Sequence, residues 1–308
     1  MNRCPITYEL CGTATYSEKG MRLIAPKFTN LNDLPYTAIE LRQEAANRAK
    51  KLSIQGVQPK LSAAISIVDQ EFKIVDQFGT YIIKPQNDLF LQLPENEDLT
   101  MRMAKVFGLE VPFHGMVYGK DGSLSYFIKR FDRYGKGKKW ATEDFAQLTG
   151  NTRDTKYRFT MEKLIPVLDE FCSFPAIEKA DFFKRILFCF VTGNEDMHLK
   201  NFSLISKNGK TTLAPVYDFL NSTIAIINPE EEIALTLKGK KNNLKAADFT
   251  DYYARERLEL NEKTITIILQ QMQKATPKWK ELIEVSFLSE DMKEKYFKLL
   301  ESRVRMFE

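Results

Sequence analysis

The amino-acid sequence predicts an α+β fold with two lobes. We expect a small β-rich lobe over residues 1–130 and a larger, mainly helical lobe over residues 131–308. The length of 308 residues allows two domains, or one bilobal unit with a sizeable core. The hydrophobic share of 44% and charged share of 28% exclude disordered and fibrous classes. Short β-prone runs lie mostly before residue 130, and helical periodicity dominates after it.

Five short β-prone runs predict the strands of the first lobe, and the last two of them form a predicted hairpin. These strands are expected over residues 61–68, 71–75, 80–84, 111–118 and 124–130. Ala38, Leu41 and Ala45 recur at helical spacing and predict a helix over residues 37–50. A second helix is expected from Pro94 to Phe107, ended by Gly108. Residues 1–35 are polar and turn-rich, without a clear period.

Helical periodicity in the second lobe predicts helices over residues 161–171 and 176–191. A polar loop, residues 193–201, follows the second of them. A hairpin is then expected, with strands over residues 202–206 and 211–216 joined by Asn208-Gly209. Residues from 248 onward are expected to be mostly amphipathic helix, with Ser289 as an N-cap.

Charge and composition narrow the function classes. The balance of 45 Lys+Arg against 41 Asp+Glu gives no general affinity for polyanions, so any basic surface must be local. The two histidines, His114 and His198, exclude a histidine-rich metal site. The chain shows no apolar leader and no run of about 20 apolar residues, so we expect a soluble, cytoplasmic protein that does not enter a membrane.

The cysteines lack the paired C-x2-C spacing of a zinc ribbon. Cys172 and Cys189 lie in apolar stretches and are expected to be reduced core residues. For Cys4 and Cys11 the sequence leaves open a disulfide, a metal site or no special role, of which the last is the commonest for two cysteines near a terminus.

A polar loop and a hairpin carry the residues that best suggest chemistry. Asp196 and Asn201 lie five residues apart in the loop, and Asp218 follows the predicted hairpin. Phosphoryl transfer needs a carboxylate that takes the proton of the attacking hydroxyl, together with an Asn and a second Asp that hold Mg²⁺. Each residue alone is equally explained as a turn cap or strand end. Their order, spacing and intervening hairpin favour the catalytic interpretation.

The first lobe contains residue types that a nucleotide site needs. Lys84 ends an apolar strand, where an unpaired ammonium is costly to bury, and we expect it to face a phosphate or a carboxylate of the next helix, Glu95 or Glu97. A lysine that reaches water is nearly as good an explanation. Residues 53–60 form a turn-prone segment with a single glycine, which alone is a weak phosphate-binding signal. The backbone of residues 128–133 could bind a purine. The alternative is that this segment is a solvated, charged connector between the lobes.

The sequence resembles the HipA-type toxin kinases. The resemblance rests on Ser-Ile-Gln-Gly-Val-Gln-Pro-Lys, Ile-Ile-Lys-Pro, Glu-Asn-Glu, Lys-Arg-Phe-Asp-Arg, Gly-Asn-x-Asp-x-His-x-Lys-Asn-Phe-Ser and Leu-Ala-Pro-x-Tyr-Asp, in this order from Ser53 to about Leu220. These proteins are serine/threonine kinases of bacterial toxin–antitoxin systems with an atypical protein-kinase-like fold. The resemblance therefore implies an ATP- and Mg²⁺-dependent serine/threonine protein kinase.

The resemblance also implies a role for individual residues. Asp196 would be the catalytic base, Asn201 and Asp218 the Mg²⁺ ligands, and Ser53 the autophosphorylated serine. The residues implied to contact ATP are Gln55, Gly56, Val57, Gln58, Pro59, Lys60, Lys84, Lys129, Arg130, Phe131, His198, Lys200, Asn201, Tyr217 and Asp218. Among these, Lys129, Arg130 and Phe131 would form the adenine hinge, and residues 217–220 would line the nucleotide. A phosphate on Ser53 would repel the ATP phosphates.

Only 52 residues precede Ser53, which is similar to the short HipT branch of the three-component HipBST systems. HipT-like loops carry two serines, whereas this chain has Ser53 and Gln55. This branch implies a small HipS-like antitoxin, a helix-turn-helix HipB-like antitoxin that alone contacts DNA, and an aminoacyl-tRNA synthetase as substrate, tryptophanyl-tRNA synthetase in particular. Lysine clusters at residues 133–139 and 238–245 are expected to be solvated loops.

Two other function classes stay open from the residues alone. A small-molecule kinase of the aminoglycoside-phosphotransferase type also carries an Asp and an Asn five apart, but it would leave Ser53 unmodified. A catalytically vestigial regulator that docks antitoxins is the second alternative. The complete set Lys84, Asp196, Asn201 and Asp218 argues against that regulator.

Overall fold

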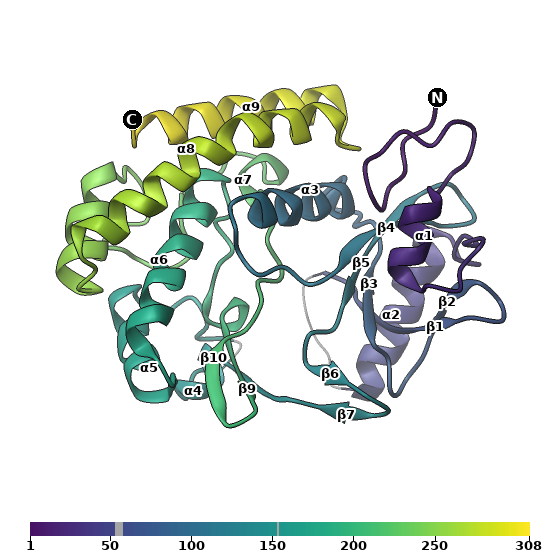
Figure 1. Cartoon of the computed structure of the whole chain (residues 1–308), viewed down its shortest axis with the longest axis horizontal. Helices are drawn as coiled ribbons and strands as arrows, with labels where there is room; N and C mark the ends of the chain where they lie inside the picture. Colours follow the sequence, from purple (N-terminus) through teal and green to yellow (C-terminus); the bar gives the residue numbers. More distant parts are fainter. Residues whose placement is uncertain (53–57, 153) are drawn as a thin grey trace. The chain divides into compact units, whose positions relative to one another are not determined.

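The computed structural model describes residues 1–52, 58–152 and 154–308 of the chain (Figure 1). The described residues form two compact units. Unit 1 comprises Met1–Asp98, Pro112–Lys138 and Val285–Leu288, and unit 2 comprises Leu99–Val111, Lys139–Glu284 and Ser289–Glu308. Each unit is therefore assembled from segments that are distant in sequence. The single division after residue 130 that the sequence suggests stays a prediction.

Unit 1 is built on a five-stranded sheet with the order β2-β1-β3-β5-β4, in which every neighbouring pair is antiparallel (Figure 1). Its strands are β1 (Leu61–Ser66), β2 (Glu71–Ile74), β3 (Tyr81–Lys84), β4 (His114–Tyr118) and β5 (Leu124–Lys129). All five lie within or close to the predicted ranges, so the β-rich first lobe is confirmed. The register places Lys84 opposite Tyr126, at the end of β3.

Aromatic side chains fill the core beside this sheet. Phe72, Tyr81 and Phe127 contact one another with ring centroids 4.9–6.0 Å apart, and all three are buried. Such offset and edge-to-face pairs stabilise a sheet beyond the effect of buried area. This core fixes β3 in the middle of the sheet and so fixes the position of Lys84 at its end.

Helix α2 (Ala38–Leu52) packs against β1 and begins at a capping box. The Glu40 amide donates to Thr37 Oγ1, and the Thr37 amide donates to the Glu40 carboxylate at 2.7 Å. Helix α3 (Leu93–Val106) ends just before Gly108, whose φ of +82° suits a helix C-terminus. Both helices agree with the prediction from sequence.

The polar and turn-rich interpretation of residues 1–35 missed a helix and much of the unit 1 core. Helix α1 (Glu18–Ile24) begins at Ser17, whose hydroxyl accepts a hydrogen bond from the Gly20 amide. The buried core residues from this region are Cys4, Ile6, Tyr16, Ile24, Ala25, Phe28, Leu31 and Leu34. All of these residues except Ile24 lie outside the helices and strands, so no helical or strand period reveals them.

Unit 2 is mainly helical and carries a small three-stranded sheet with the order β10-β9-β8. Its main early elements are β8 (Ala141–Asp144), α4 (Phe145–Leu148), α5 (Ile165–Phe171), α6 (Pro175–Val191), β9 (Ser203–Lys207), β10 (Lys210–Leu213) and α7 (Ser222–Ala225). Single 3-10 turns are Glu162–Leu164 and Leu199–Asn201. The short ribbon of β6 (Arg133–Tyr134) and β7 (Lys138–Lys139) precedes β8.

The hairpin of β9 and β10 turns at Asn208 and Gly209, both with positive φ, as the Asn-Gly pair predicts (Figure 1). Strand β10 ends at Leu213, three residues before the expected end at Val216. The Val216 amide donates instead to the Glu110 carbonyl at 2.9 Å. Strand β8 was not predicted; it pairs with β9 along its whole length.

The C-terminal part of unit 2 is helical, as expected. It contains the π-helical segment Asp248–Arg257, α8 (Glu262–Val285) and α9 (Glu290–Arg305), and Ser289 is the N-cap of α9. Trp279 of α8 is buried, and its indole nitrogen donates to the Met103 carbonyl at 2.8 Å. None of the helices that the structure describes has the length and apolar character needed to cross a membrane.

Candidate functional site

The loop of residues 193–203 begins where α6 ends, at Gly193. This glycine has a φ of +74°, and a Cβ atom there would lie 2.4 Å from Leu299 Cδ2 and 2.5 Å from Asn221 Oδ1. Its carbonyl accepts hydrogen bonds from the Thr223 amide and hydroxyl, both at 3.0 Å. Only glycine fits this turn, which directs the polar loop away from the apolar helix.

Asp196 is the half-exposed carboxylate of this loop, with 47% of its side chain accessible. Its amide donates to Asn194 Oδ1 at 3.2 Å, and its carbonyl accepts from Asn201 Nδ2 at 2.9 Å. The Asn201 amide nitrogen is thus used to hold the loop. Within the described part of the chain, no hydrogen bond to the Asn201 amide oxygen is found, and this oxygen is the atom that binds cations.

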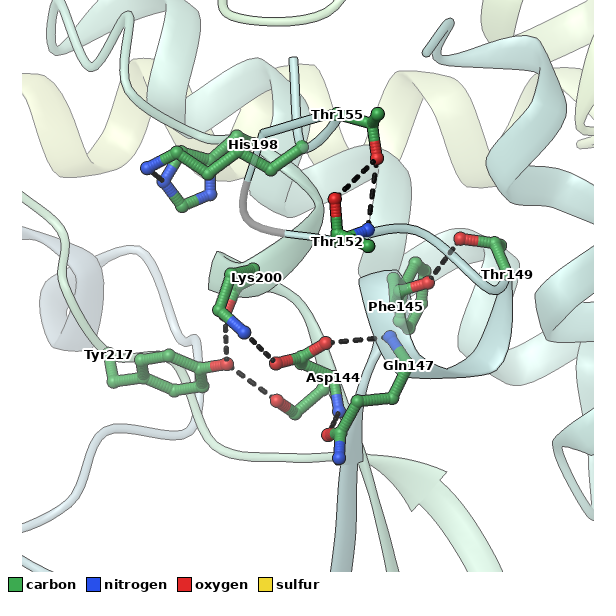
Figure 2. A network of polar contacts seen from close by, with 11 residues as sticks. Asp144, Phe145, Gln147, Thr149, Thr152, Thr155, His198, Lys200 and Tyr217 are labelled. Carbon is green, nitrogen blue, oxygen red and sulfur yellow. Dashed lines mark hydrogen bonds and ion pairs between the residues drawn. The ribbon is translucent and has the colours of Figure 1, made fainter. Parts of the chain in front are cut away.

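The segment that carries Asp218 is tied to the same loop. The Tyr217 hydroxyl lies 2.5 Å from Ser203 Oγ and donates to the Lys200 carbonyl at 3.0 Å. Figure 2 shows the Tyr217 hydroxyl directed toward Lys200. Burial raises the pKa of Tyr217 well above its usual value, so the phenol stays protonated. Asp218 follows with a φ of +56°, an uncommon backbone conformation for aspartate. Unit 2 thus connects the segment before Asp218 to the loop that carries Asp196 and Asn201, and the catalytic and metal-binding roles of these three residues stay predictions.

Lys200 contacts Asp144, a residue that was not predicted from the sequence. Its ammonium contacts Asp144 Oδ2 at 3.0 Å, and Asp144 also caps α4 through the Gln147 amide (Figure 2). The Asp144 and Gln147 pair forms a reciprocal capping box. A capping pattern was the only available signal for Asp144. The predicted role of Lys200 at the nucleotide stays a prediction.

His198 is almost fully buried, with 5% exposure. Its Nε2 lies 2.6 Å from the Lys156 ammonium, and its ring packs edge-to-face on Tyr157 with centroids 4.9 Å apart. Burial lowers the pKa of His198, and Lys156 lowers it further, while Asp196 and Asp218 act in the opposite sense. The imidazole is therefore neutral near pH 7 and accepts from Lys156.

Tyr157 is the other residue of this region that sequence reasoning missed. Its hydroxyl donates a short hydrogen bond to Asp196 Oδ1. Burial and the adjacent Asp196 carboxylate both raise the pKa of Tyr157, so it is a neutral donor. No motif or period marks the stretch of residues 154–158, because its position depends on tertiary contacts with the loop.

In unit 1, Lys84 and Glu97 form a buried ion pair. Lys84 Nζ lies 2.6 Å from Glu97 Oε1, and the side chains are 2% and 1% exposed. The expectation of a carboxylate partner from the next helix is confirmed, with Glu97 as that partner. Glu95 instead accepts from Gln86 Nε2 at 2.8 and 2.9 Å, and burial raises the pKa of Glu95 to about 7.

The predicted phosphate-facing loop is described only in part. Ser53, Gln55, Gly56 and Val57 lie outside the described residues. Gln58, Pro59 and Lys60 are half-buried and lead directly into β1.

The predicted adenine hinge lies at the end of β5. The Lys129 amide donates to the Phe113 carbonyl and the Arg130 amide to the Thr80 carbonyl, both at 2.8 Å. The Arg130 guanidinium pairs with Asp132 at 2.8 and 3.0 Å. Because these two amides are already hydrogen-bonded, the predicted adenine hinge would have to use carbonyl groups or residues from Phe131 onward, and it stays a prediction.

The predicted magnesium ligands, Asn201 and Asp218, are oxygen donors of the kind that the cation prefers. Among the residues that the structure describes, no three His, Cys, Asp or Glu side chains form a metal-binding cluster. Mg²⁺ in nucleotide sites is held by one or two protein oxygens together with phosphate oxygens and water. Asn201 and Asp218 supply two such oxygens, so their chemistry fits the ion.

All four cysteines are free, and Cys4, Cys172 and Cys189 are buried.

Two solved structures share the fold of this chain. One is the Shewanella oneidensis HipA–HipB–operator DNA complex, with a TM-score of 0.70 at 22% identity, covering 90% of this chain and 72% of that one. The other is the Helicobacter pylori proinflammatory kinase CtkA, with a TM-score of 0.53 at 17% identity, covering 73% and 86%. The fold is thus of the atypical protein-kinase-like class, with a β-rich N-lobe and a helical C-lobe.

Within that class the family is defined by sequence. The family model described as HipA-like C-terminal domain matches residues 52–279. The chain therefore belongs to the HipA-like family.

Three relatives found by sequence similarity carry names that agree with membership of this family. A Haemophilus influenzae protein named "Putative kinase" is 32% identical over 71% of this chain, and a Sinorhizobium fredii protein named "Putative kinase Y4dM" is 33% identical over 72%. The serine/threonine-protein kinase toxin HipA of Shewanella oneidensis is 29% identical over 56% of the chain. The matches span 65%, 57% and 43% of the lengths of these three relatives.

Proposed function

We propose that this protein is an ATP- and Mg²⁺-dependent serine/threonine protein kinase that acts as the toxin of a toxin–antitoxin system. One observation carries this proposal: Asp196 is half-exposed on a loop whose shape is fixed by Asn201, and Tyr217 ties the Asp218 segment to that loop. These contacts support the proposal, because phosphoryl transfer requires a base and two metal ligands on neighbouring segments. The names of the relatives support the same activity.

Each residue has a defined task in this proposal. Asp196 accepts the proton of the acceptor hydroxyl and orients its oxygen. Asn201 and Asp218 would hold Mg²⁺, which supplies charge neutralisation at the phosphates when it is bound. Lys84, oriented by Glu97, binds ATP phosphate oxygens.

The remaining contacts with the nucleotide follow from the resemblance. The phosphate-facing loop comprises Gln55, Gly56, Val57, Gln58, Pro59 and Lys60. The adenine hinge comprises Lys129, Arg130 and Phe131, while His198, Lys200 and Tyr217 line the nucleotide. Ser53 is the proposed autophosphorylation site. A phosphate of about −1.5 to −2 charges there would repel ATP and silence the kinase.

The proposed target is an aminoacyl-tRNA synthetase, tryptophanyl-tRNA synthetase by resemblance, so the toxin inhibits translation in the cytoplasm. The proposed partners are a HipS-like and a HipB-like antitoxin, with DNA contacted only through the latter. A structural relative forms a complex with HipB and operator DNA, which supports antitoxin binding in general. In the lysine cluster at residues 238–245, Lys240 and Lys241 contact Asp248 and Glu231 at 3.5 and 3.0 Å.

The test compares wild type with Asp196→Asn and Asp218→Asn. Both substitutions should abolish transfer of ³²P from ATP and growth inhibition, because each removes one charged group from the reaction. Asp169→Asn, an exposed aspartate outside the site, should leave both unchanged. Persistent toxicity in either site variant would contradict the proposal.

Two further measurements separate the alternatives. Intact-mass analysis after incubation with ATP should show one added phosphate that is lost in Ser53→Ala; an unmodified protein that phosphorylates aminoglycosides would be a small-molecule kinase. A protein that captures antitoxins yet never transfers phosphate would be a vestigial regulator. Phosphoproteomics of cells that express wild type or Asp196→Asn identifies the target.

A further inference from the structure

The stretch of residues 154–158, here called the strap, is fastened to the loop that carries Asp196. The Leu199 amide donates to the Lys156 carbonyl at 3.4 Å, and the Lys156 ammonium lies 2.6 Å from His198 Nε2. The Tyr157 ring packs on His198 at a centroid distance of 4.9 Å, and its hydroxyl donates to Asp196 Oδ1. Three residues of the loop are therefore contacted by two of the strap.

The Tyr157 hydroxyl makes the contact that a phosphoryl acceptor must make. A serine or threonine hydroxyl reacts only when it donates to the carboxylate that takes its proton. In this structure Asp196 Oδ1 already accepts a hydroxyl from within the chain. The tyrosine is therefore an internal mimic of the acceptor.

We infer that Tyr157 occupies the acceptor-hydroxyl position on Asp196 and that a protein acceptor binds by displacing it. The inference rests on the proposed kinase function and adds a determinant of acceptor affinity. It also assigns a second role to the contact, because a base covered by Tyr157 is less open to water, the unwanted acceptor of the phosphoryl group.

The strap is held in a way that permits displacement. Tyr157 is 41% exposed, and its neighbour Arg158 is exposed as well. The contacts of the strap with the loop named above are hydrogen bonds and one aromatic ring contact. Such segments open at low free-energy cost compared with core elements.

The decisive variant is Tyr157→Phe, which removes the hydroxyl and keeps the ring on His198. Phosphate transfer is measured with the full-length chain and the peptide Ala-Lys-Lys-Leu-Ser-Ile-Gln-Gly-Val-Gln-Pro-Lys, copied from residues 49–60, as acceptor. We expect the KM for the peptide to fall about tenfold, the effect of removing one competing hydrogen bond to a carboxylate, with the KM for ATP unchanged. Phosphate release from ATP without peptide should rise.

Tyr252→Phe is the matched control, because Tyr252 also donates to a carboxylate, that of Glu162, away from the catalytic loop. It should change neither KM. Tyr157→Ala, which removes the ring as well, should lower the peptide KM at least as much as Tyr157→Phe.

Two results would overturn the inference while leaving the kinase function intact. One is an unchanged peptide KM in both Tyr157 variants. The other is a lower kcat at unchanged peptide KM in Tyr157→Phe, which would make Tyr157 a residue that positions the base. Failure of the wild type to transfer phosphate to any acceptor would instead refute the kinase function itself, and the inference with it.

Discussion

At the scale of single residues, Lys84 and Glu97 depend on each other. Each is almost fully buried, and removing one charge leaves the other without its partner at 2.6 Å. We expect Lys84→Met and Glu97→Leu each to lower the free energy of unfolding by about 3–5 kcal/mol, and the double variant to recover most of that loss. Urea unfolding measures the stability, and a ³²P assay should find all three variants inactive.

An exposed ion pair serves as the control for this buried pair. Lys295 contacts Asp291 at 2.7 Å with side chains 54% and 70% accessible, so Lys295→Met should cost less than about 1 kcal/mol. A Lys84→Met protein as stable as wild type would show that the buried pair does not stabilise the fold.

Glu95 gives unit 1 a dependence on pH. Its pKa is about 7, above the ordinary 4.5, because burial disfavours the charged form. The stabilisation due to the neutral carboxyl is therefore complete below pH 4.5 and is lost as the pH rises through 7. We expect Glu95→Gln to match wild type near pH 5 and to be more stable at pH 8.5, by on the order of 2–3 kcal/mol. Thermal unfolding over this range measures the difference.

Glu290, with 91% of its side chain exposed, provides the comparison, since Glu290→Gln should change the free energy of unfolding by less than about 1 kcal/mol. Parallel curves for Glu95→Gln and wild type would contradict the raised pKa of Glu95.

The partner of Lys84 shows how far residue-level prediction reaches. The sequence indicated a carboxylate from the first turn of the next helix but left Glu95 and Glu97 open. Residues two apart on a helix point about 200° away from each other, so only one can face a given strand. Which one faces it depends on the rotation of α3 in the core, and this is set by contacts distant in sequence. The same limit hid Lys156, Tyr157 and Asp144.

At the scale of elements, the end of α6 depends on Gly193. Gly193→Ala would combine a φ of +74° with contacts of 2.4 and 2.5 Å to Leu299 and Asn221. We expect a loss of about 2–4 kcal/mol in the free energy of unfolding, together with reduced phosphate transfer because the loop that carries Asp196 moves. Chemical denaturation and the ³²P assay measure the two effects.

Gly209→Ala separates the effect of the positive φ from the effect of close contacts with an added Cβ atom. Its φ of +75° is almost the same, but no atom lies within 4 Å of an added Cβ. Gly209→Ala should therefore cost only about 1–2 kcal/mol, the price of the backbone conformation alone. Equal losses for the two variants would show that the close contacts at Gly193 contribute nothing.

Elements with a clear period were predicted well, and elements without one were missed. Helices α2, α6 and α9 and the Asn208-Gly209 hairpin followed from spacing and turn chemistry. Helix α1 and strand β8 did not. The seven residues of α1 are too few to establish a period. Strand β8 is defined by its pairing with β9, a contact between segments distant in sequence.

At the scale of the whole molecule, the two units draw on segments that lie far apart in the chain. Helix α3 begins in unit 1 and continues in unit 2, and Val285–Leu288 returns to unit 1 between α8 and α9. Composition and periodicity report neighbours in sequence, so they predicted the β-rich and helical character of the lobes but not these returns. The order of the sequence motifs was more informative, because it predicted the HipA-like family, which the family model over residues 52–279 confirms.

The proposed function also predicts how the whole protein responds to its ligands. A ligand that binds only the folded state raises the free energy of unfolding by about 2.7 kcal/mol at 100 times its Kd. ATP with Mg²⁺ should therefore raise the Tm of the wild-type protein by roughly 5 °C, and EDTA should remove most of that shift. Asp218→Asn should keep the Tm of the free protein but lose most of the shift, because one proposed metal ligand is gone. Asp291→Asn, at an exposed position on α9, should respond like wild type. Differential scanning calorimetry measures all three, and an equal shift in Asp218→Asn and wild type would exclude Asp218 as a ligand of the nucleotide-bound metal.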